Sequence, residues 1–225
     1  MIVIATTKQY NIDNYSKYIK DEYESVLITD KDDLNIKTIK KLNPTFIFFP
    51  HWSWIIPAEI YEEFECVIFH MTDLPFGRGG SPLQNLIVMG EKNTKISALR
   101  AVKELDAGDI YMKEDLSLEG KAIEIYERAS KIIFGKMIDT IINNTPILTP
   151  QSGKTIKFKR RSPEQSDIQE LESLEKIYDY IRMLDAPSYP HAFIQTKNFK
   201  IEFKDAILKD DIIECKTSIT LKGSK

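Results

Sequence analysis

The chain has 225 residues, of which 42% are hydrophobic, and its 31 basic and 34 acidic side chains give a formal net charge of -3. A chain of this length buries a substantial core, and its charge balance provides no general basic field to hold a nucleic acid. The two cysteines, Cys66 and Cys215, do not indicate a disulfide framework or a zinc site. The start of the chain does not resemble a signal peptide, and no stretch reaches the ~18 apolar residues of a membrane span. Composition therefore predicts a cytoplasmic protein with no nucleic-acid or membrane partner.

The first third of the chain alternates apolar runs with helix-like polar segments. Short apolar runs at Ile2–Ala5, Ser25–Ile28 and Phe46–Phe49 look like buried strands. Helices are expected between them, over Tyr10–Lys20 and Leu34–Leu42. The order strand–helix–strand–helix–strand predicts an α/β fold with a doubly wound, mostly parallel sheet. No G-x-G-x-x-G follows the first strand, so a dinucleotide-binding fingerprint is absent.

A fourth apolar run, Cys66–Phe69, ends at His70 and leads into a loop rich in proline and glycine. The sequence from Phe69 to Pro82 is FHMTDLPFGRGGSP. In open α/β sheets, ligands bind beyond the carboxyl ends of the strands, which is where His70 is expected. Histidine suits acid–base chemistry, and glycines on both sides of Arg78 let the main chain approach a ligand closely. On its own, a histidine at a strand end is more often structural.

Two motifs resemble the 10-formyltetrahydrofolate-dependent formyltransferases. Residues 70–82 are similar to the family's H-x-S-L-L-P-x-x-R-G-x-x-P loop, and the segment LDAGDI at residues 105–110 is similar to its D-x-G-x-I segment. The resemblance implies a Rossmann-like formyltransferase catalytic domain over residues 1–150, with His70 and Asp106 as catalytic residues. It also implies 10-formyltetrahydrofolate as the formyl donor, bound by the two loops through Leu74, Pro75, Arg78, Gly79, Leu105, Ala107 and Gly108.

The mechanism implied by this resemblance requires no metal ion. A substrate amine attacks the formyl carbon carried on N10 of tetrahydrofolate, while His70 polarises the formyl oxygen or carries the proton of the amine. Asp106 stabilises the protonated imidazole and takes part in proton removal. The sequence shows no cluster of metal ligands.

One position departs from the family pattern. Relatives place asparagine two residues before the histidine, where this chain has Ile68. Residues two apart on a strand share a face, so Ile68 and His70 are expected to face one pocket. The asparagine is a donor to the developing oxyanion, and such a donor is worth about 10²–10³ in rate. We expect His51, at the end of the adjacent strand, to replace it, with Asn85, Trp52 or a backbone N–H as alternatives.

The expected acceptor-binding residues come from three places in the chain. Trp52 and Trp54 follow the third strand, where they either cap the sheet as core residues or stack on a flat ring of the ligand. Asn85 and Arg161 are the remaining candidates, the second of them in a basic run at residues 153–161.

Residues 151–225 are expected to form a small α+β appendage that follows a long amphipathic helix at Glu119–Asn144. A capping box at Ser166-x-x-Gln169 is expected to open a helix, and short strands to follow it. Residues 181–193 resemble a segment of nucleotide-sugar formyltransferases. By its size and charge, the appendage is not expected to be the tRNA-binding domain of methionyl-tRNA formyltransferases.

The amino-acid sequence of the His70 loop is most similar to that of pseudaminic acid N-formyltransferases, which modify a 7-amino nonulosonic acid carried on CMP. The resemblance therefore implies N-formylation of an amino-sugar nucleotide for surface glycans such as O-antigen. The implied partners are that nucleotide and folate, and the implied assembly is a monomer or homodimer. Two alternatives stay open: hydrolysis of formyltetrahydrofolate, and a non-catalytic folate-binding relative, which Ile68 would allow.

Overall fold

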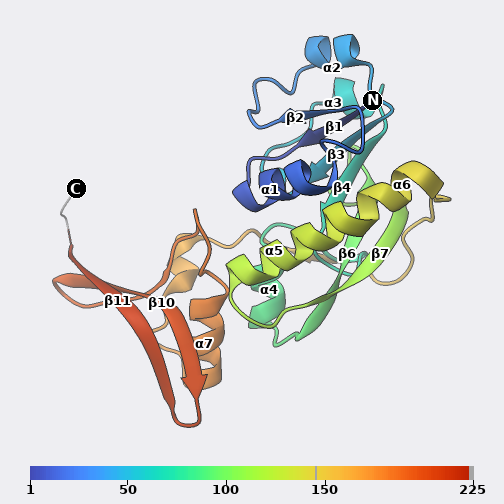
Figure 1. Ribbon diagram of the computed structural model, residues 1–225. Helices are drawn as coiled ribbons and strands as arrows, with labels where there is room; N and C mark the ends of the chain where they lie inside the picture. The colour runs from blue at the N-terminus through green and yellow to red at the C-terminus, as the bar shows by residue number, and fades with distance from the viewer. Residues whose placement is uncertain (145, 223–225) are drawn as a thin grey trace. The chain divides into compact units, whose positions relative to one another are not determined.

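The computed structural model in Figure 1 describes residues 1–144 and 146–222. Its residues fall into two compact units. The sheet unit consists of Met1–Gly79, Thr94–Leu116 and Tyr126–Lys157, and the hairpin unit consists of Gly80–Asn93, Ser117–Ile125 and the chain from Phe158 onward. Two segments expected in the catalytic domain thus cluster with the C-terminal part. The division into domains 1–150 and 151–225 stays a prediction, and its residues 145 and 223–225 lie outside the described residues.

A six-stranded sheet organises the sheet unit. Its strands are β1 (Ile2–Ala5), β2 (Ser25–Ile28), β3 (Phe46–Pro50), β4 (Cys66–His70), β6 (Asn93–Arg100) and β7 (Ile110–Ser117). The strand order is β2-β1-β3-β4-β6-β7. β1 pairs in parallel with β2 and β3, β3 pairs in parallel with β4, and β4 pairs antiparallel with β6. The predicted α/β fold with a mostly parallel sheet is therefore confirmed.

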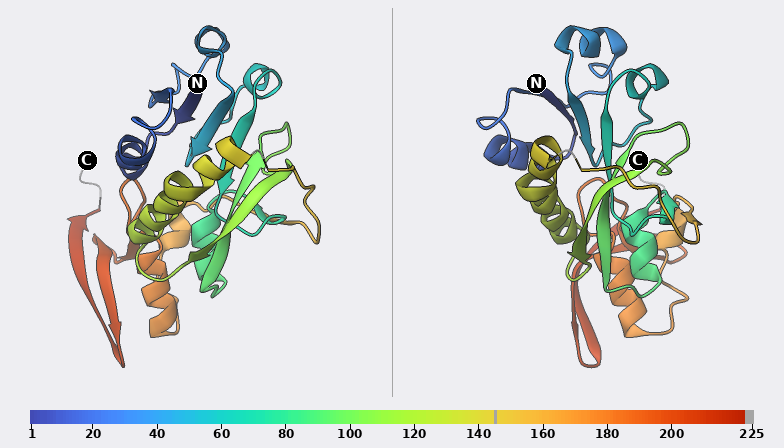
Figure 2. Two further views of the ribbon diagram at one scale, coloured as in Figure 1. Left: turned by 45° about the vertical axis from the view of Figure 1, so that its right-hand side comes forward. Right: turned by 90° about the vertical axis from the view of Figure 1, so that its right-hand side faces the viewer.

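Helices connect the parallel strands, as the alternating pattern predicts. They are α1 (Gln9–Tyr18), α2 (Ile36–Leu42) and α3 (Ala58–Tyr61). The long helix expected over Glu119–Asn144 begins later, at Ala122, and consists of α5 (Ala122–Ile132), the π-helical turn η1 (Ile133–Met137) and α6 (Ile138–Asn144). Figure 2 shows these three as one continuous ribbon. Apolar residues of β1 and β3 and the helices beside them form the core, including Val3, Ile39, Ile47, Phe49 and Ile60.

The hairpin unit carries a separate antiparallel sheet. Its elements are α4 (Pro82–Val88), the 3₁₀ turn η2 (Pro163–Ser166), α7 (Leu174–Arg182), β9 (Ala192–Gln195), β10 (Phe199–Lys209) and β11 (Ile212–Leu221). The strand order is β11-β10-β9, and the pairing of β10 with β11 is interrupted by a bulge between Lys204 and Ile207. The two long strands form the ribbon labelled β10 and β11 in Figure 1, so the expectation of short strands is wrong.

The expected position of the capping box is also wrong, because the box lies four residues earlier in the chain. The S-x-x-Q spacing occurs twice in succession, and the structure uses Ser162 with Gln165 instead of Ser166 with Gln169. Pro163, at the first position after Ser162, favours this choice because its φ is already helical and it has no N–H to satisfy. The α7 helix starts later, where the Ser173 hydroxyl accepts from the N–H of Lys176.

A two-stranded sheet joins the glycine-rich loop to the basic run. It pairs β5 (Phe76–Gly79) with β8 (Ile156–Phe158), so the strand expected over residues 153–161 is only three residues long. The N–H of Ile156 donates to the carbonyl of Pro75 beside it. Within the described residues, no helix is both long enough and apolar enough to cross a membrane.

Candidate active site

His70 and Asp106 meet in the sheet unit. His70 is the last residue of β4, and Asp106 lies in the loop between β6 and β7. The imidazole Nδ1 is 3.7 Å from the Asp106 Oδ2, and the two side chains are 8% and 7% exposed. The other ring nitrogen, Nε2, lies 2.8 Å from the carbonyl oxygen of Gly77. A carbonyl can only accept, so Nε2 carries a proton and donates it. The nitrogen that can gain or lose a proton therefore faces the carboxylate.

The backbone of the Asp106 loop is shaped for this contact. Asp106 has φ of 53°, in the left-handed region that aspartate enters more readily than most residues. Its Oδ2 also accepts from the N–H of Gly79 at 2.9 Å. At Gly108, a Cβ would lie 1.9 Å from the carbonyl oxygen of Arg100, so a side chain does not fit there. The D-x-G spacing therefore serves three needs: the carboxylate, a left-handed backbone at Asp106, and the absence of a side chain at Gly108.

Gln151 belongs to this site, although the sequence gives no indication of it. Its side-chain Nε2 donates to the carbonyls of Asp106 and Gly108, at 2.9 and 2.8 Å. Its Oε1 accepts from Nε and Nη2 of Arg78. A glutamine beside a proline, at an expected domain boundary, carries no recognisable pattern, so only the three-dimensional contacts reveal it.

The predicted folate-binding residues differ in what they expose. Leu74 is fully buried and packs with Leu99 and Ile110, so its side chain is not exposed, and its role in folate binding stays a prediction. Leu105, in contrast, is 63% exposed directly before Asp106. An exposed apolar side chain beside a buried acid suits a flat ring such as a pterin. Pro75 is buried, Arg78, Gly79 and Ala107 are half-buried, and Gly108 is buried.

Ile68 is the least buried residue of β4. The other four residues of the strand are buried, whereas Ile68 is half-buried. It is paired with Phe49 of β3 on one side and Leu99 of β6 on the other. A residue in the interior of a sheet keeps solvent contact only where its face is uncovered. Ile68 also packs against both neighbouring core clusters, and its place in a ligand site together with His70 stays a prediction.

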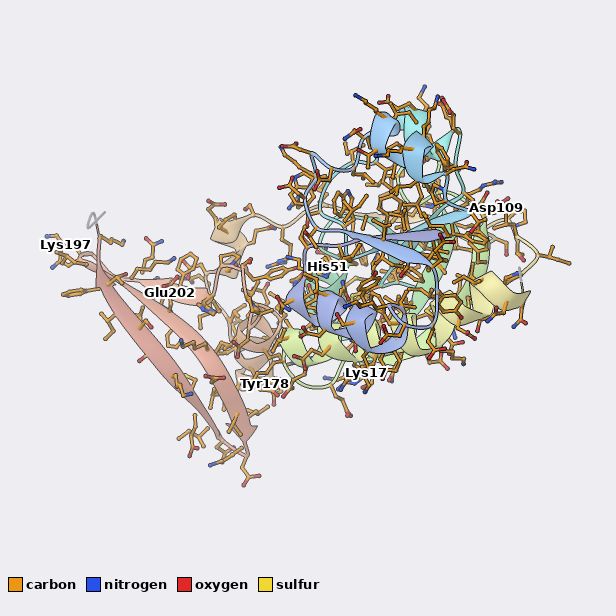
Figure 3. All side chains as sticks on the ribbon, turned by 45° about the horizontal axis from the view of Figure 1, so that its top comes forward. Lys17, His51, Asp109, Tyr178, Lys197 and Glu202 are labelled. Carbon is orange, nitrogen blue, oxygen red and sulfur yellow. The ribbon has the colours of Figure 1, made fainter. Side chains whose placement is uncertain are left out.

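His51 follows the end of β3 and has φ of 53°. Its Nδ1 shares a 2.6 Å hydrogen bond with the hydroxyl of Tyr10, and its ring lies 4.9 Å from that of Tyr126. Burial lowers its pKa to about 3, with a smaller contribution from the charge of Lys8. The ring is therefore neutral at pH 7. Figure 3 labels this residue, which is half-buried in the sheet unit. The role as oxyanion donor stays a prediction, but the contacts also give His51 a packing role.

The two tryptophans separate into a packed and an exposed residue. Trp52 is half-buried against the core and lies edge-on to Phe49, with ring centroids 6.2 Å apart. Its Nε1 is buried and has no hydrogen-bond partner among the described residues. Trp54 is 45% exposed and contacts Trp52 edge-on at 4.9 Å. The core interpretation fits Trp52, while Trp54 keeps a surface that a ligand can contact.

Asn85 and Arg161 belong to the hairpin unit, where both make structural contacts. The Asn85 amide donates to the carbonyls of Gly80 and Lys159 at 3.0 Å each. Arg161 donates to the carbonyl of Gln165 and lies over the ring of Tyr180. Their expected roles in acceptor binding stay predictions.

Comparison with known proteins identifies the family to which this pair of acid–base residues belongs. The family model described as "Formyl transferase" matches residues 6–129, which is more than half of the chain. The chain belongs to the formyltransferase family. A second family model, described as "Methionyl-tRNA formyltransferase, C-terminal domain", matches residues 163–220. This match corrects the expectation that the appendage is not the tRNA-binding domain of such enzymes, which rested on size and charge alone.

Individual relatives agree with the family match. A solved methionyl-tRNA formyltransferase from Clostridium thermocellum is 52% identical, covers 98% of both chains and superposes with a TM-score of 0.96. A methionyl-tRNA formyltransferase of Rickettsia africae is 31% identical over 185 residues, which are 79% of this chain and 60% of the relative. This formyltransferase thus spans about three fifths of the length of such curated relatives. HypX from Aquifex aeolicus shares the fold, with 18% identity, a TM-score of 0.81, and coverage of 94% of this chain and 40% of its own.

These matches confirm the predicted enzyme class and the predicted donor, 10-formyltetrahydrofolate, as properties of the family. They contradict the expected amino-sugar acceptor, the pseudaminic acid and O-antigen assignment, and the exclusion of a nucleic-acid partner. The resemblance to the amino-sugar branch rests on short segments around residues 70–87 and 181–193, whereas the similarity to the methionyl-tRNA formyltransferase covers 98% of the chain.

Proposed function

We propose that this formyltransferase moves the formyl group of 10-formyltetrahydrofolate to the amino group of methionyl-tRNA. The observation that carries the proposal is the 52% identity to a methionyl-tRNA formyltransferase over 98% of both chains. The match of residues 163–220 to the C-terminal domain of such enzymes supports the same acceptor. The buried His70–Asp106 pair supplies the acid–base groups that transfer to an amine requires.

The transfer forms one C–N bond and breaks another. The amine nitrogen of the acceptor bonds to the formyl carbon, and the bond from that carbon to N10 of tetrahydrofolate breaks. The proton lost by the amine is taken by Nδ1 of His70, because Nε2 already donates to Gly77. Asp106, 3.7 Å away, stabilises the imidazolium that results. The proton is then returned to N10, which leaves as the amine of tetrahydrofolate.

The net charge of -3 does not argue against a tRNA acceptor, because phosphates are contacted by local groups of basic residues. Lys154, Lys159 and Arg160 are exposed within one short stretch of chain. A substitution that removes one phosphate contact lowers the slope of log affinity against log salt by about one unit. These residues are the chain's own candidates for phosphate contacts.

The test is a formylation assay on the purified protein. Methionyl-tRNA and 10-formyltetrahydrofolate are incubated with it, and formylmethionine is measured by mass spectrometry after mild deacylation of the tRNA. We expect formylmethionine from the wild type and at least about a hundredfold less from His70→Ala. Uncharged tRNA and free methionine are the control acceptors. Release of tetrahydrofolate without formylmethionine would contradict the proposal and indicate hydrolysis of the donor.

A further inference from the structure

We propose that Gln151 is a positioning residue that holds Asp106 in reach of His70, and that Arg78 fixes the orientation of its amide. The kinetic part of this inference rests on the proposed function, whereas its structural part does not. The four side chains involved lie within the sheet unit. Gln151 itself is half-buried and sits between the glycine-rich loop and the Asp106 loop.

The contacts of Gln151 leave its amide one orientation. Two carbonyl oxygens, of Asp106 and Gly108, lie 2.9 and 2.8 Å from Nε2 and can only accept. Two guanidinium nitrogens of Arg78 lie 3.0 and 2.8 Å from Oε1 and can only donate. Reversing the amide would set donor against donor and acceptor against acceptor. Gln151 therefore joins the two loops through four mutually consistent hydrogen bonds.

These bonds act on the part of the loop that needs support. A non-glycine residue in the left-handed region costs on the order of 1–3 kcal/mol unless its surroundings hold it there. Asp106 is such a residue, with φ of 53°. Gln151 binds the carbonyl of Asp106 itself, and the Asp106 carboxylate in turn accepts from Gly79. Losing the amide donor would let the peptide rotate and would move Oδ2 away from His70.

Arg78 takes a supporting role in this arrangement. Its side chain is only 13% exposed, and Nη1 lies 3.8 Å from the Glu104 carboxylate. Nε and Nη2 are both engaged by Gln151, so these nitrogens are not available to a ligand while the arrangement holds. The resemblance implies a folate contact for Arg78, whereas the geometry assigns it to the support of the Asp106 loop.

The first test compares two substitutions of Gln151 in the formylation assay. Gln151→Leu removes all four bonds, and Gln151→Glu keeps the acceptor for Arg78 but sets an oxygen against the carbonyls of Asp106 and Gly108. We expect kcat to fall about ten- to a hundredfold in both, with KM for the donor changed less than about threefold. Gln195→Leu, at an exposed position of β9, is the matched control and should behave as wild type. Full activity of Gln151→Glu would overturn the inference, because the bonds from Gln151 to the carbonyls of Asp106 and Gly108 would then not be needed for turnover.

The second test asks whether Gln151 acts through Asp106. A variant with both Gln151→Leu and Asp106→Asn should be no slower than Asp106→Asn alone, and multiplied losses would overturn the inference. The structural part is read from amide hydrogen exchange, which needs no acceptor. Exchange at the Gly79 N–H should speed up at least about tenfold in Gln151→Leu and stay unchanged in Gln195→Leu. Unchanged exchange at Gly79 would refute the support of the loop, even if methionyl-tRNA proves not to be the acceptor.

Discussion

Two histidines lie at the carboxyl ends of neighbouring parallel strands of the sheet, and their rings have different partners. His70 closes β4 with Nε2 committed to a carbonyl and Nδ1 facing the Asp106 carboxylate. His51 directly follows β3, adjacent to β4, and shares a hydrogen bond with the uncharged Tyr10. Burial and the nearby Lys8 lower the pKa of His51 to about 3.

The comparison shows that a place at the carboxyl edge of a sheet does not decide what a histidine does. A carboxylate partner stabilises an imidazolium, so His70 is suited to accept a proton. Burial and the nearby charge of Lys8 keep His51 neutral, so it is suited to hydrogen bonding without a change of charge. The proposed mechanism needs one residue of each kind: a proton carrier, and a neutral donor for the oxyanion.

The largest effects are expected from breaking the His70–Asp106 pair. Either His70→Ala or Asp106→Asn should lower kcat/KM at least about a hundredfold, because proton transfer loses its carrier or the carrier loses its counter-charge. If the two act as a unit, the double variant should be little slower than the slower single variant. The measurement is a double-mutant cycle on formylation kinetics.

The matched control for the carboxylate is Asp109→Asn. Asp109, which is labelled in Figure 3, lies three residues beyond Asp106 but is exposed. We expect Asp109→Asn to retain wild-type kinetics. Losses in the double variant that multiply in full would show that His70 and Asp106 act separately.

The fold was largely predictable because its first half is locally consistent. Continuous apolar runs such as Ile2–Ala5 form strands buried on both faces, and polar segments between them form the connecting helices. The hairpin unit was less predictable. β10 and β11 alternate apolar and polar residues without a conspicuous turn sequence, and their length depends on pairing with each other. The helix after Ser173 was expected to begin too early, because Ser166-x-x-Gln169 has the spacing of a capping box, whereas the residue that caps this helix is Ser173.

Within the site, His70 and Asp106 were predictable because they lie inside motifs, and the structure brings them together. Gln151 was not predictable, since its role depends on four bonds to residues at least 43 positions away. The burial of Leu74 was hidden for a similar reason. A leucine in a loop motif looks like a ligand contact until its packing against Leu99 and Ile110 is known. The acceptor was not predictable from the two short segments, because they contain far fewer positions than the whole chain.

The next effect concerns His51 as a neutral donor. His51→Ala is expected to lower turnover at least about tenfold, or ~1.4 kcal/mol, while the affinity for folate stays nearly unchanged. Tyr10→Phe keeps the aromatic ring and removes the hydroxyl that holds Nδ1, so it should give a smaller loss. The measurements are kcat and the dissociation constant of a folate analogue. Wild-type turnover in His51→Ala would leave His51 a packing residue only.

The lowered pKa of His51 also predicts a pH dependence of stability. Between about pH 6.5 and pH 3, an unfolded chain binds a proton at this position and the folded chain does not. The folded state therefore loses stability as the pH falls through this window. In His51→Gln this proton is absent, so the slope of the unfolding free energy against pH should decrease by up to about 1.4 kcal/mol per pH unit, the value for one proton. The measurement is the free energy of unfolding in urea, taken at several values between neutral pH and the lower end of this window. Parallel curves for the two proteins would refute the lowered pKa of His51.

The smallest effect is expected from Ile68→Asn, which tests whether His51 and position 68 can donate to the same oxyanion. Ile68 is half-buried on β4, and an asparagine there would place an amide donor two residues before His70, on the same face. If His51 supplies the missing oxyanion donor, Ile68→Asn should change the turnover of the wild type less than about threefold, because His51 already donates to the oxyanion. In the His51→Ala background the same substitution should recover at least about threefold, or ~0.65 kcal/mol. Ile68→Val is the matched control, since it changes the volume of the side chain without adding a donor. Equal effects of Ile68→Asn in both backgrounds would mean that the two positions do not serve the same oxygen, and the donor would then have to come from the backbone of the glycine-rich loop.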